Sequence, residues 1–531
     1  MLDAILRGGM VVDGEGTPAF RADVGIRGET IVEVGDLEAA DAACSIDATG
    51  RYVTPGFIDI HTHSDLVVFP NPRMESKVRQ GVTTEVVGNC GEGYAPLTPM
   101  AVETARREMA RYGTELTWRS MGGYLAAVEK SGTAVNIAAF VGHGILRESV
   151  MQYEMRPPTS GEMDAMKRLL IQSMEEGAVG YTSGLIYPPS SFADTEELIE
   201  LARAMAPYGG VYATHLRNQS SHLLQSVAEA IQIGEESGTA VQISHLKATG
   251  RANWGKVAAV LEIVDRARER GVDVTCDRYP YVASSTGLSA MVPPWVHEGG
   301  PTKLVERLKD SRTRRRVAEE MVLPEPLWEN FGMSVGWDKI LIADCASNRG
   351  YEGRNIAEIA AERGQDARDC VFDLLIENDA HVACVLFSMG EEDVVDALRH
   401  PSVTIGSDSR AAAPYGPLGK GKPHPRAYGT FPRVLAEYVR NRRSLTWEDA
   451  VAKMTSRPAD RLGLRGRGRV AAGCFADIVV LDPETVADQA TFMEPHQYPI
   501  GIEYVIVNGT VVVDGGEHTG MLPGKSLSRG R

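Results

Sequence analysis

The middle of the chain alternates short apolar runs with segments of helical periodicity. Amphipathic segments such as 195–206 and 223–237 lie between most of the apolar runs and predict helices. Apolar runs of strand length recur eight times, at residues 57–61, 83–87, 135–141, 178–182, 210–214, 240–244, 272–276 and 403–407. This alternation is typical of a parallel α/β sheet or barrel. Eight strands favour a (β/α)8, TIM-like barrel, whose chemistry lies at the carboxyl ends of its strands.

Both ends of the chain show a different, β-type pattern. Alternating runs broken by Gly and Asp fill residues 1 to 52, and similar runs return at 476–481 and 504–513. We expect a small β-sandwich domain built from both termini, residues 1–54 and 466–531. Two separate hairpins are the alternative, and the similar turn chemistry of the two ends favours one shared domain.

A long interruption separates the seventh and eighth predicted strands. Roughly a hundred residues follow Tyr281 before the last strand begins, more than a βα connection needs. This stretch contains charged helical sequence at 304–321 and strand-like runs at 339–343 and 382–387. We expect an inserted lid subdomain at residues 286–350, which divides the barrel into residues 55–285 and 351–465.

Composition and charge narrow the class of protein. Of the 531 residues, 43% are apolar and 24% are charged, as in an ordinary folded enzyme. A formal charge of -16 argues against nucleic acid or an anionic membrane as partner. No apolar segment is long enough to span a bilayer, and the first residues do not resemble a signal peptide. Seven scattered cysteines fit a reducing compartment. We therefore expect a cytoplasmic protein with a small-molecule partner, which forms either a monomer or a homo-oligomer.

Candidate metal ligands occur where the predicted strands end. The first barrel strand ends in His61-Thr62-His63, and alternate residues of a strand share a face, so both imidazoles point the same way. Four further candidates each follow another predicted strand: Cys90, His215, His245 and Asp408. Taken singly, a buried Cys or His is more often structural. Together, imidazole, thiolate and carboxylate groups from several strand ends predict a zinc-type site.

These candidates lie in motifs that resemble known enzymes. Pro55-Gly56-Phe57-Ile58-Asp59 before His61-Thr62-His63, followed by His215, His245 and Asp408, is similar to the amidohydrolase superfamily of metal-dependent hydrolases. Five narrower segments resemble its N-acyl-D-amino-acid deacylases, or D-aminoacylases: Gly81–Thr84 with Asn89–Gly91, Ser183–Pro189, Thr214–Asn218, Ile243–Lys247 and Pro423–Arg426. The resemblance covers almost the whole chain, including the terminal β-structure and the insert.

The resemblance implies a zinc-dependent hydrolase that splits the linear amide of N-acyl-D-amino acids into a carboxylic acid and a free D-amino acid. Many superfamily members bridge two metals with a carboxylated lysine on the fourth strand, but residues 177–183 contain no lysine. The resemblance implies that Cys90 takes this role. We expect one or two Zn²⁺ per subunit, with Asp408 as general base and acid. The expected ligands are His215, His245 and Cys90 for a tight site and His61, His63 and Asp408 for a weaker one.

Substrate contacts are predicted beside these ligands. Lys247 follows His245 by two residues and would share its face on an extended strand end, although a solvated loop lysine is an equal alternative. Tyr279 resembles a carboxylate-binding residue of the deacylases, and we prefer it to Tyr281. Tyr187 is expected to line the pocket, with simple packing as the alternative.

The side-chain preference and the reaction class remain open at this point. Arg278 and Arg410 would either recognise an acidic side chain, such as that of D-Glu or D-Asp, or pair with local acids. A cyclic-amide hydrolase of the dihydroorotase or hydantoinase type is the second hypothesis, against which the missing fourth-strand lysine speaks. A non-enzymatic scaffold is the third, and the complete ligand set speaks against it.

Overall fold

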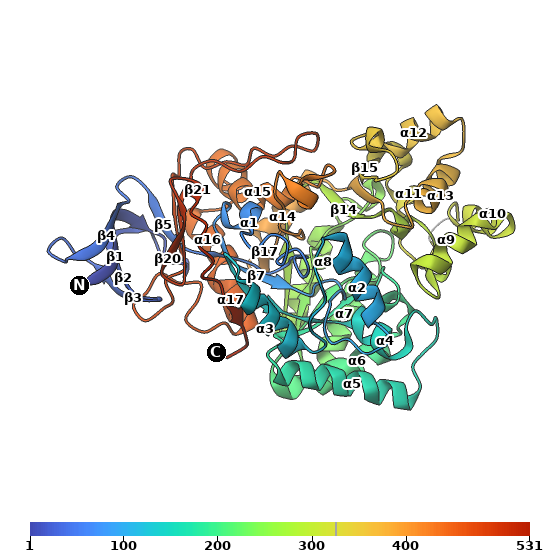
Figure 1. The fold of residues 1–531 in the computed structure, drawn as a ribbon, viewed down its shortest axis with the longest axis horizontal. Helices are drawn as coiled ribbons and strands as arrows, with labels where there is room; N and C mark the ends of the chain where they lie inside the picture. Colours follow the sequence, from blue (N-terminus) through green and yellow to red (C-terminus); the bar gives the residue numbers. More distant parts are fainter. Residues whose placement is uncertain (324–325, 531) are drawn as a thin grey trace.

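The computed structural model describes residues 1–323 and 326–530, and a parallel barrel occupies its centre (Figure 1). Hydrogen bonds order the barrel strands as β6-β7-β8 and β9-β10-β11-β12-β13-β17. Phe140 separates β8 from β9, which together fill one strand position. A bridge between Thr62 and Ser409 closes the barrel between its first and last strands. The predicted (β/α)8 barrel is therefore confirmed, with β6 (Phe57–Asp59), β7 (Val82–Val87), β8 (Asn136–Ala139), β9 (Val141–Gly142), β10 (Gly180–Gly184), β11 (Val211–His215), β12 (Ala240–Ile243), β13 (Val274–Arg278) and β17 (Val403–Ile405).

Helices on the outside of the barrel cover the outer face of its strands. The helices α5 (Ser160–Glu175), α6 (Thr195–Met205), α7 (Leu223–Ser237) and α8 (Lys256–Glu269) pack against one another in chain order. The predicted helices at 195–206 and 223–237 are confirmed to within one residue. Strand β10 lies two residues later than expected, because its pairing with β11 continues to the Gly184–His215 pair at the carboxyl edge.

Strands from both termini form a second part of the molecule. Strand β5 pairs antiparallel with β18, from Tyr52 with Leu481 to Pro55 with Ile478, and so joins the two ends. Figure 1 shows these blue and red strands side by side at the left. Side chains from both termini, such as Leu6 and Val480, share one hydrophobic cluster. The nine strands are β1 (Leu2–Val11), β2 (Phe20–Arg27), β3 (Thr30–Gly35), β4 (Ala42–Asp47), β5 (Tyr52–Pro55), β18 (Ile478–Leu481), β19 (Ile502–Val507), β20 (Thr510–Asp514) and β21 (Glu517–His518).

The last strand of the chain, β22 (Ser526–Leu527), does not belong to the terminal sheet; it pairs with a barrel strand instead. It runs parallel to β8, where Ser526 pairs with Ile137 and Leu527 with Ala138. The backbone N–H of Ile137 donates to the carbonyl of Lys525 at 2.9 Å. The carboxyl end of the chain therefore completes the hydrogen bonding of a barrel strand.

The insert before the last barrel strand has its own core. Figure 1 shows it in yellow and green tones, on the side of the barrel opposite the terminal sheet. A separate hydrophobic cluster runs from Leu288 to Leu386. A boundary at residue 350 would divide this cluster, because Ile356 and Phe372 also pack in it. We therefore propose that the inserted unit extends to β16, with the elements β14 (Ala283–Gly287), α9 (Pro301–Lys309), α10 (Ser311–Glu320), β15 (Ile340–Asp344), α12 (Ile356–Arg363), α13 (Ala367–Glu377) and β16 (Ala383–Phe387).

The helical stretch expected at 304–321 consists of two helices. Asp310 ends α9 and caps α10, where its carboxylate accepts from the N–H and hydroxyl of Thr313, both at 2.7 Å. Asp is a favoured N-cap because it satisfies N–H groups that a helix start leaves free. None of the described helices is long and apolar enough to cross a bilayer. All seven cysteines are unpaired.

Candidate metal centre

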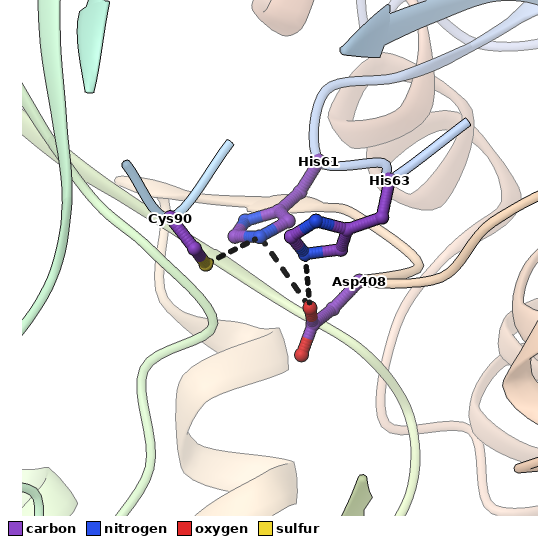
Figure 2. A group of neighbouring side chains, drawn as sticks. All are labelled: His61, His63, Cys90 and Asp408. Carbon is purple, nitrogen blue, oxygen red and sulfur yellow. Dashed lines mark hydrogen bonds and ion pairs between the residues drawn. The ribbon is translucent and has the colours of Figure 1, made fainter. Parts of the chain in front are cut away.

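Six side chains meet at the carboxyl edge of the barrel in two groups that share Cys90. One group contains His61, His63, Cys90 and Asp408, and the other contains Cys90, His215 and His245; the ligand atoms of each group lie within 4.8 Å of one another. Figure 2 shows the first group, in which the four side chains point toward a common centre. All six residues proposed from the sequence are thus brought together.

The distances inside the cluster match those around a zinc ion. The Cys90 Sγ lies 3.3 Å from His61 Nε2, 3.4 Å from His245 Nε2 and 3.8 Å from His215 Nδ1. Tetrahedral zinc, with Zn–S of about 2.3 Å and Zn–N of about 2.0–2.1 Å, places sulfur and nitrogen ligands about 3.6 Å apart. The donor types and their spacing therefore fit zinc, with the thiolate shared between the two groups.

Three of the six side chains project from a strained backbone. Cys90, His245 and Asp408 have φ angles of 54°, 37° and 52°, in the left-handed region that residues other than glycine rarely adopt. Each follows a barrel strand, namely β7, β12 or β17. The turn aims the side chain across the barrel mouth. Such strain clusters at functional sites, where the surrounding structure holds it in place.

Two glycines let the Cys90 turn approach its neighbours. A Cβ at Gly184 of β10 would lie 1.9 Å from the Cys90 carbonyl oxygen, and a Cβ at Gly88 would lie 2.4 Å from the Phe140 carbonyl oxygen. Both separations are far below van der Waals contact. Because glycine has no Cβ, the backbone around Cys90 can press against Phe140 and β10 and bring the thiol to the cluster.

Asp277 on β13 holds the ring of one ligand histidine and the backbone of another. One carboxylate oxygen lies 3.1 Å from His61 Nδ1 and accepts from the backbone N–H of His245 at 2.8 Å. Burial opposes protonation of His61, but the Asp277 carboxylate and the Cys90 thiolate outweigh it and raise the pKa of His61 to about 10. The acidic groups thus favour a positive charge at the centre of the cluster. A carboxylate that holds the second nitrogen of a ligating His is common around metals.

His215 and His245, the two histidines of the second group, are held in their neutral form. Burial, reinforced by the Lys247 ammonium, lowers the pKa values of His215 and His245 far below their usual range. Neutral imidazole is the form that binds a metal ion. The Lys247 Nζ lies 2.7 Å from His245 Nδ1 and donates to the His245 carbonyl at 3.1 Å. Burial lowers the pKa of Lys247 itself to about 7.

Asp408 faces histidines with one oxygen and an arginine with the other. Its Oδ1 lies 3.1 Å from His63 Nε2 and 3.5 Å from His61 Nε2, and its Oδ2 lies 2.9 Å from Arg426 Nη1. Burial would raise the pKa of Asp408, but Arg426 and His245 hold it well below its usual range. The carboxylate is therefore held in its ionised form.

Tyr279 and Tyr281, the two tyrosines considered as substrate contacts, have different neighbours. Tyr279 lies between the guanidinium groups of Arg278 and Arg426, each 4.7 Å from its ring centre, and Lys247 Nζ is 5.9 Å from the same point. The ring of Tyr281 instead stacks under Arg433 at 4.9 Å. This arrangement favours Tyr279 over Tyr281 as a residue beside the cluster.

Arg278 points away from the cavities at the metal centre. It is buried, donates to the Tyr281 carbonyl at 2.9 Å and lies 3.2 Å from the Met389 sulfur. Arg410 reaches the Tyr112 hydroxyl at 2.9 Å. Neither arginine is among the described residues that line the two cavities next to the cluster. The positions favour a structural role over recognition of an acidic side chain.

Two adjoining cavities open from the cluster. The smaller, of about 270 Å³, is lined by His63, Cys90, Asp408, Arg426 and residues of β14. The larger, of about 320 Å³, begins at Cys90 and extends toward α2 (Val102–Arg111) and α4 (His143–Met151). Tyr187 lines both; its hydroxyl lies 2.9 Å from the Thr286 hydroxyl, and its ring meets the His215 ring edge-to-face at 5.1 Å. Together the cavities give a small molecule access to the cluster.

Three residues beside the ligands were missed in the sequence: Asp277, Arg426 and Glu92. Asp277 could have been predicted from strand alternation, because residues 277 and 279 share one face of a strand and residue 278 lies on the other. Arg426 lies in a segment that already resembled the deacylases, but nothing in the sequence pairs it with Asp408. Glu92, whose Oε2 lies 3.2 Å from His63 Nδ1, occupies a turn without a motif.

Known proteins of similar sequence and structure match this chain along nearly its whole length. A family model described as the amidohydrolase family matches residues 45–513. An N-acyl-D-glutamate deacylase from Alcaligenes xylosoxydans xylosoxydans is 40% identical over 511 residues, which cover 96% of this chain and 93% of that protein. A D-aminoacylase structure concerned with the role of its binuclear metal centre has a TM-score of 0.84 at 37% identity, with both chains fully covered. The N-acyl-D-glutamate deacylase of Bordetella bronchiseptica, complexed with zinc and a phosphonate mimic of the tetrahedral intermediate, has a TM-score of 0.83 at 36% identity, with 99% of each chain covered.

Proposed function

Because the chain belongs to the amidohydrolase family, and within it to the N-acyl-D-amino-acid deacylases, we propose that it hydrolyses the linear amide of N-acyl-D-amino acids. The products are a carboxylic acid and a free D-amino acid. The observation that carries the proposal is the position of Cys90, whose Sγ lies within 3.8 Å of three imidazole nitrogens in a barrel whose fourth strand has no lysine. Relatives of 36–40% identity that are named deacylases support the same reaction.

We propose zinc as the cofactor, with one or two ions per subunit. His215, His245 and Cys90 would hold one ion, and His61, His63 and Asp408 a second that shares Cys90. Bound zinc would lower the pKa of water from 15.7 to about 7 and polarise the amide carbonyl. Spacing and donor type support this ligand set, and the zinc complex of the Bordetella relative supports the choice of metal.

The chain's own residues supply the proton transfers. Asp408 is ionised, so it would take a proton from the attacking water and later give it to the leaving amine. General acid–base catalysis of this kind contributes roughly 10²–10⁴ in rate. Asp277 would keep the ring of His61 oriented during these steps. Tyr187 would help to exclude bulk water, since it lines both cavities next to the cluster.

The carboxylate of the substrate would lie on the cationic side of the cluster. Lys247, Arg426 and Tyr279 are buried together there, and the Tyr279 hydroxyl makes no hydrogen bond within the described residues. A buried cation and a hydroxyl donor together supply the positive charge and the hydrogen bonds that bind an α-carboxylate. A cytoplasmic location is a further proposal, supported by seven cysteines that are all unpaired.

A substrate screen tests the proposed function. The zinc-loaded chain would be given matched N-acetyl-D- and N-acetyl-L-amino acids, and free amine would be measured; metal-stripped protein is the control. We expect release from D-substrates that is lost on chelation and restored by zinc. Hydantoin and dihydrouracil form a second arm, and ring opening faster than hydrolysis of any N-acetyl-D-amino acid would assign the site to cyclic amides instead.

A further inference from the structure

The larger cavity at the metal centre combines apolar walls with acidic groups. Its wall is formed by aliphatic and aromatic side chains that fit an aliphatic stem: Tyr94, Ala101, Ala105, Ile145, Tyr153 and Ile186. Three carboxylates line the same cavity, namely those of Glu92, Glu108 and Glu148. Arg278, expected from the sequence as an anion-binding group, is not among its described lining residues.

Two of the three carboxylates already have basic partners. Glu92 lies 3.2 Å from His63, and its side chain is 58% exposed. Glu108 lies 3.2 Å from His381 and 3.6 Å from Arg111. Among the described residues, Glu148 is therefore the one carboxylate of the three for which no basic partner is found.

Glu148 on α4 is buried without a cation. Only 8% of the residue is exposed, and it borders both the larger cavity and the groove beyond it, between α2 and the insert. The groups that act on its carboxyl are its own burial, the Thr104 hydroxyl and the like charge of Glu108. No Lys, Arg or His nitrogen of the described residues forms an ion pair with it. A buried carboxylate is costly without an opposite charge.

We propose that this cavity binds a cationic end of the substrate, an ammonium or guanidinium on an aliphatic stem, with Glu148 as its partner. The inference rests on the proposed function and defines its substrate class. The apolar walls would bury the stem, while the Tyr94 and Tyr153 rings add favourable faces for a cation. The three carboxylates would repel an acidic group, so the cavity selects against substrates such as N-acyl-D-glutamate.

The cationic group has two possible sources, which the experiment separates. Either the D-amino acid side chain or the acyl group extends from the scissile amide into the cavity. N-acetyl-D-lysine and N-acetyl-D-norleucine differ only by the terminal ammonium and test the side chain. N-(6-aminohexanoyl)-D-alanine and N-hexanoyl-D-alanine apply the same difference to the acyl group.

The decisive measurement is kcat/KM of the zinc-loaded full chain for both pairs. We expect the cationic member of one pair to be preferred by about ten-fold, as charge-assisted hydrogen bonds allow. Glu148→Gln should abolish that preference, because it should lower kcat/KM for the cationic member far more than for the neutral member. Glu103→Gln, an exposed acid of α2 outside both cavities, is the matched control and should keep the preference.

Two results would overturn the proposal in distinguishable ways. Turnover of N-acyl-D-amino acids without a cationic preference in either pair, or with a preference that survives Glu148→Gln, would remove the cation site and leave the deacylase function intact. Failure to hydrolyse any N-acyl-D-amino acid would remove both proposals.

A pH series gives a second readout. Burial raises the pKa of Glu148 to about 7, helped by Glu108 and opposed by Thr104. The preference should therefore grow as the pH rises through about 7, since the carboxylate forms over that range. Among the other titratable groups that line the cavity, Tyr153 has its pKa raised further above its usual range and His297 has its pKa lowered to about 4. Burial would raise the pKa of Glu108, but His381 and Arg111 lower it, so none of the three changes charge near pH 7. A preference that falls with rising pH would contradict the role of Glu148.

Discussion

At positions 90, 245 and 408 the left-handed backbone favours glycine, whereas metal binding requires the side chains of Cys, His and Asp. A left-handed turn costs a residue with a Cβ about 1–2 kcal/mol, and glycine would relieve this cost at each position. Cys, His and Asp occupy these turns instead. Side chains retained against such a cost indicate that each of the three contributes something that glycine cannot supply.

The thiol of Cys90 is expected to determine how much zinc the chain retains. Cys90→Ala removes the atom shared by both ligand groups, so the zinc-to-protein ratio after gel filtration should fall. Cys276→Ala is the matched control, because Cys276 is also buried but belongs to neither ligand group. A ratio in Cys90→Ala equal to that of the control would exclude the thiol as a ligand.

The carboxylate of Asp408 is expected to matter for turnover rather than for folding. Asp408→Asn keeps the shape of the side chain but cannot accept a proton, so kcat should fall by roughly 10²–10⁴. The circular dichroism spectrum should match that of the wild type, and zinc should still be present. Turnover within error of the wild type would remove Asp408 from the proton transfers.

The ligand positions could be read from the sequence because each follows an apolar run of strand length. Parallel strands bring their carboxyl ends to one edge, so separate residues are predicted to meet there. Asp277 and Arg278 show the limit of this reasoning. Arg278, which was predicted to contact the substrate, lies on the opposite face from the ligands, whereas Asp277 contacts the His61 ring and the His245 backbone. Alternation along the strand separates these two residues once the strand's register is known.

At the scale of elements, the insert contains a break between two helices, α9 and α10, that the sequence pattern did not predict. The sequence indicated helix over 304–321 but not the break, since charged residues continue through it. Asp310 followed by Thr313 is the local signal, because an Asp side chain that accepts from a backbone N–H three residues later starts a new helix. The far boundary of the insert depends on long-range packing in its core, which local patterns do not report.

Asp310→Ala is expected to destabilise the insert by about 1 kcal/mol, the usual contribution of an N-cap. The reason is that the first N–H groups of α10 would lose their carboxylate partner. Hydrogen exchange over residues 311–320 should accelerate, while exchange in the barrel strands remains unchanged. Asp338→Ala, a change at an exposed acid of the insert outside a helix cap, serves as the control. Equal exchange in α10 of both variants would exclude a capping role.

At the scale of the whole molecule, the two chain termini support the barrel from different sides. The terminal sheet joins β5 to β18, and β22 pairs with β8. Leu527 of β22 packs in a cluster with Ile58 and Val86, residues of the first two barrel strands. The sequence predicted the shared terminal β-structure, but not the return of the chain to the barrel, because two residues of strand are too short to give a periodic signal.

Deletion of residues 525–531 is expected to destabilise the barrel by about 2–4 kcal/mol, since it removes the burial of Leu527 and the backbone pairing with β8. The measurement is the thermal unfolding midpoint, with activity as a second readout. Deletion of residues 530–531 alone leaves β22 in place and is the control. Equal midpoints for both deletions would show that β22 contributes no stability.

The pairing of β5 with β18 also has a consequence during protein synthesis. These partners lie about 425 residues apart, so at 5–20 residues per second β5 emerges from the ribosome roughly 20–85 s before β18 exists. Throughout this interval one edge of the nascent β1–β5 sheet has no neighbour, and such edges recruit other extended chains. Slower initiation, which spaces nascent chains further apart, or a supply of chaperones should therefore raise the yield of active protein.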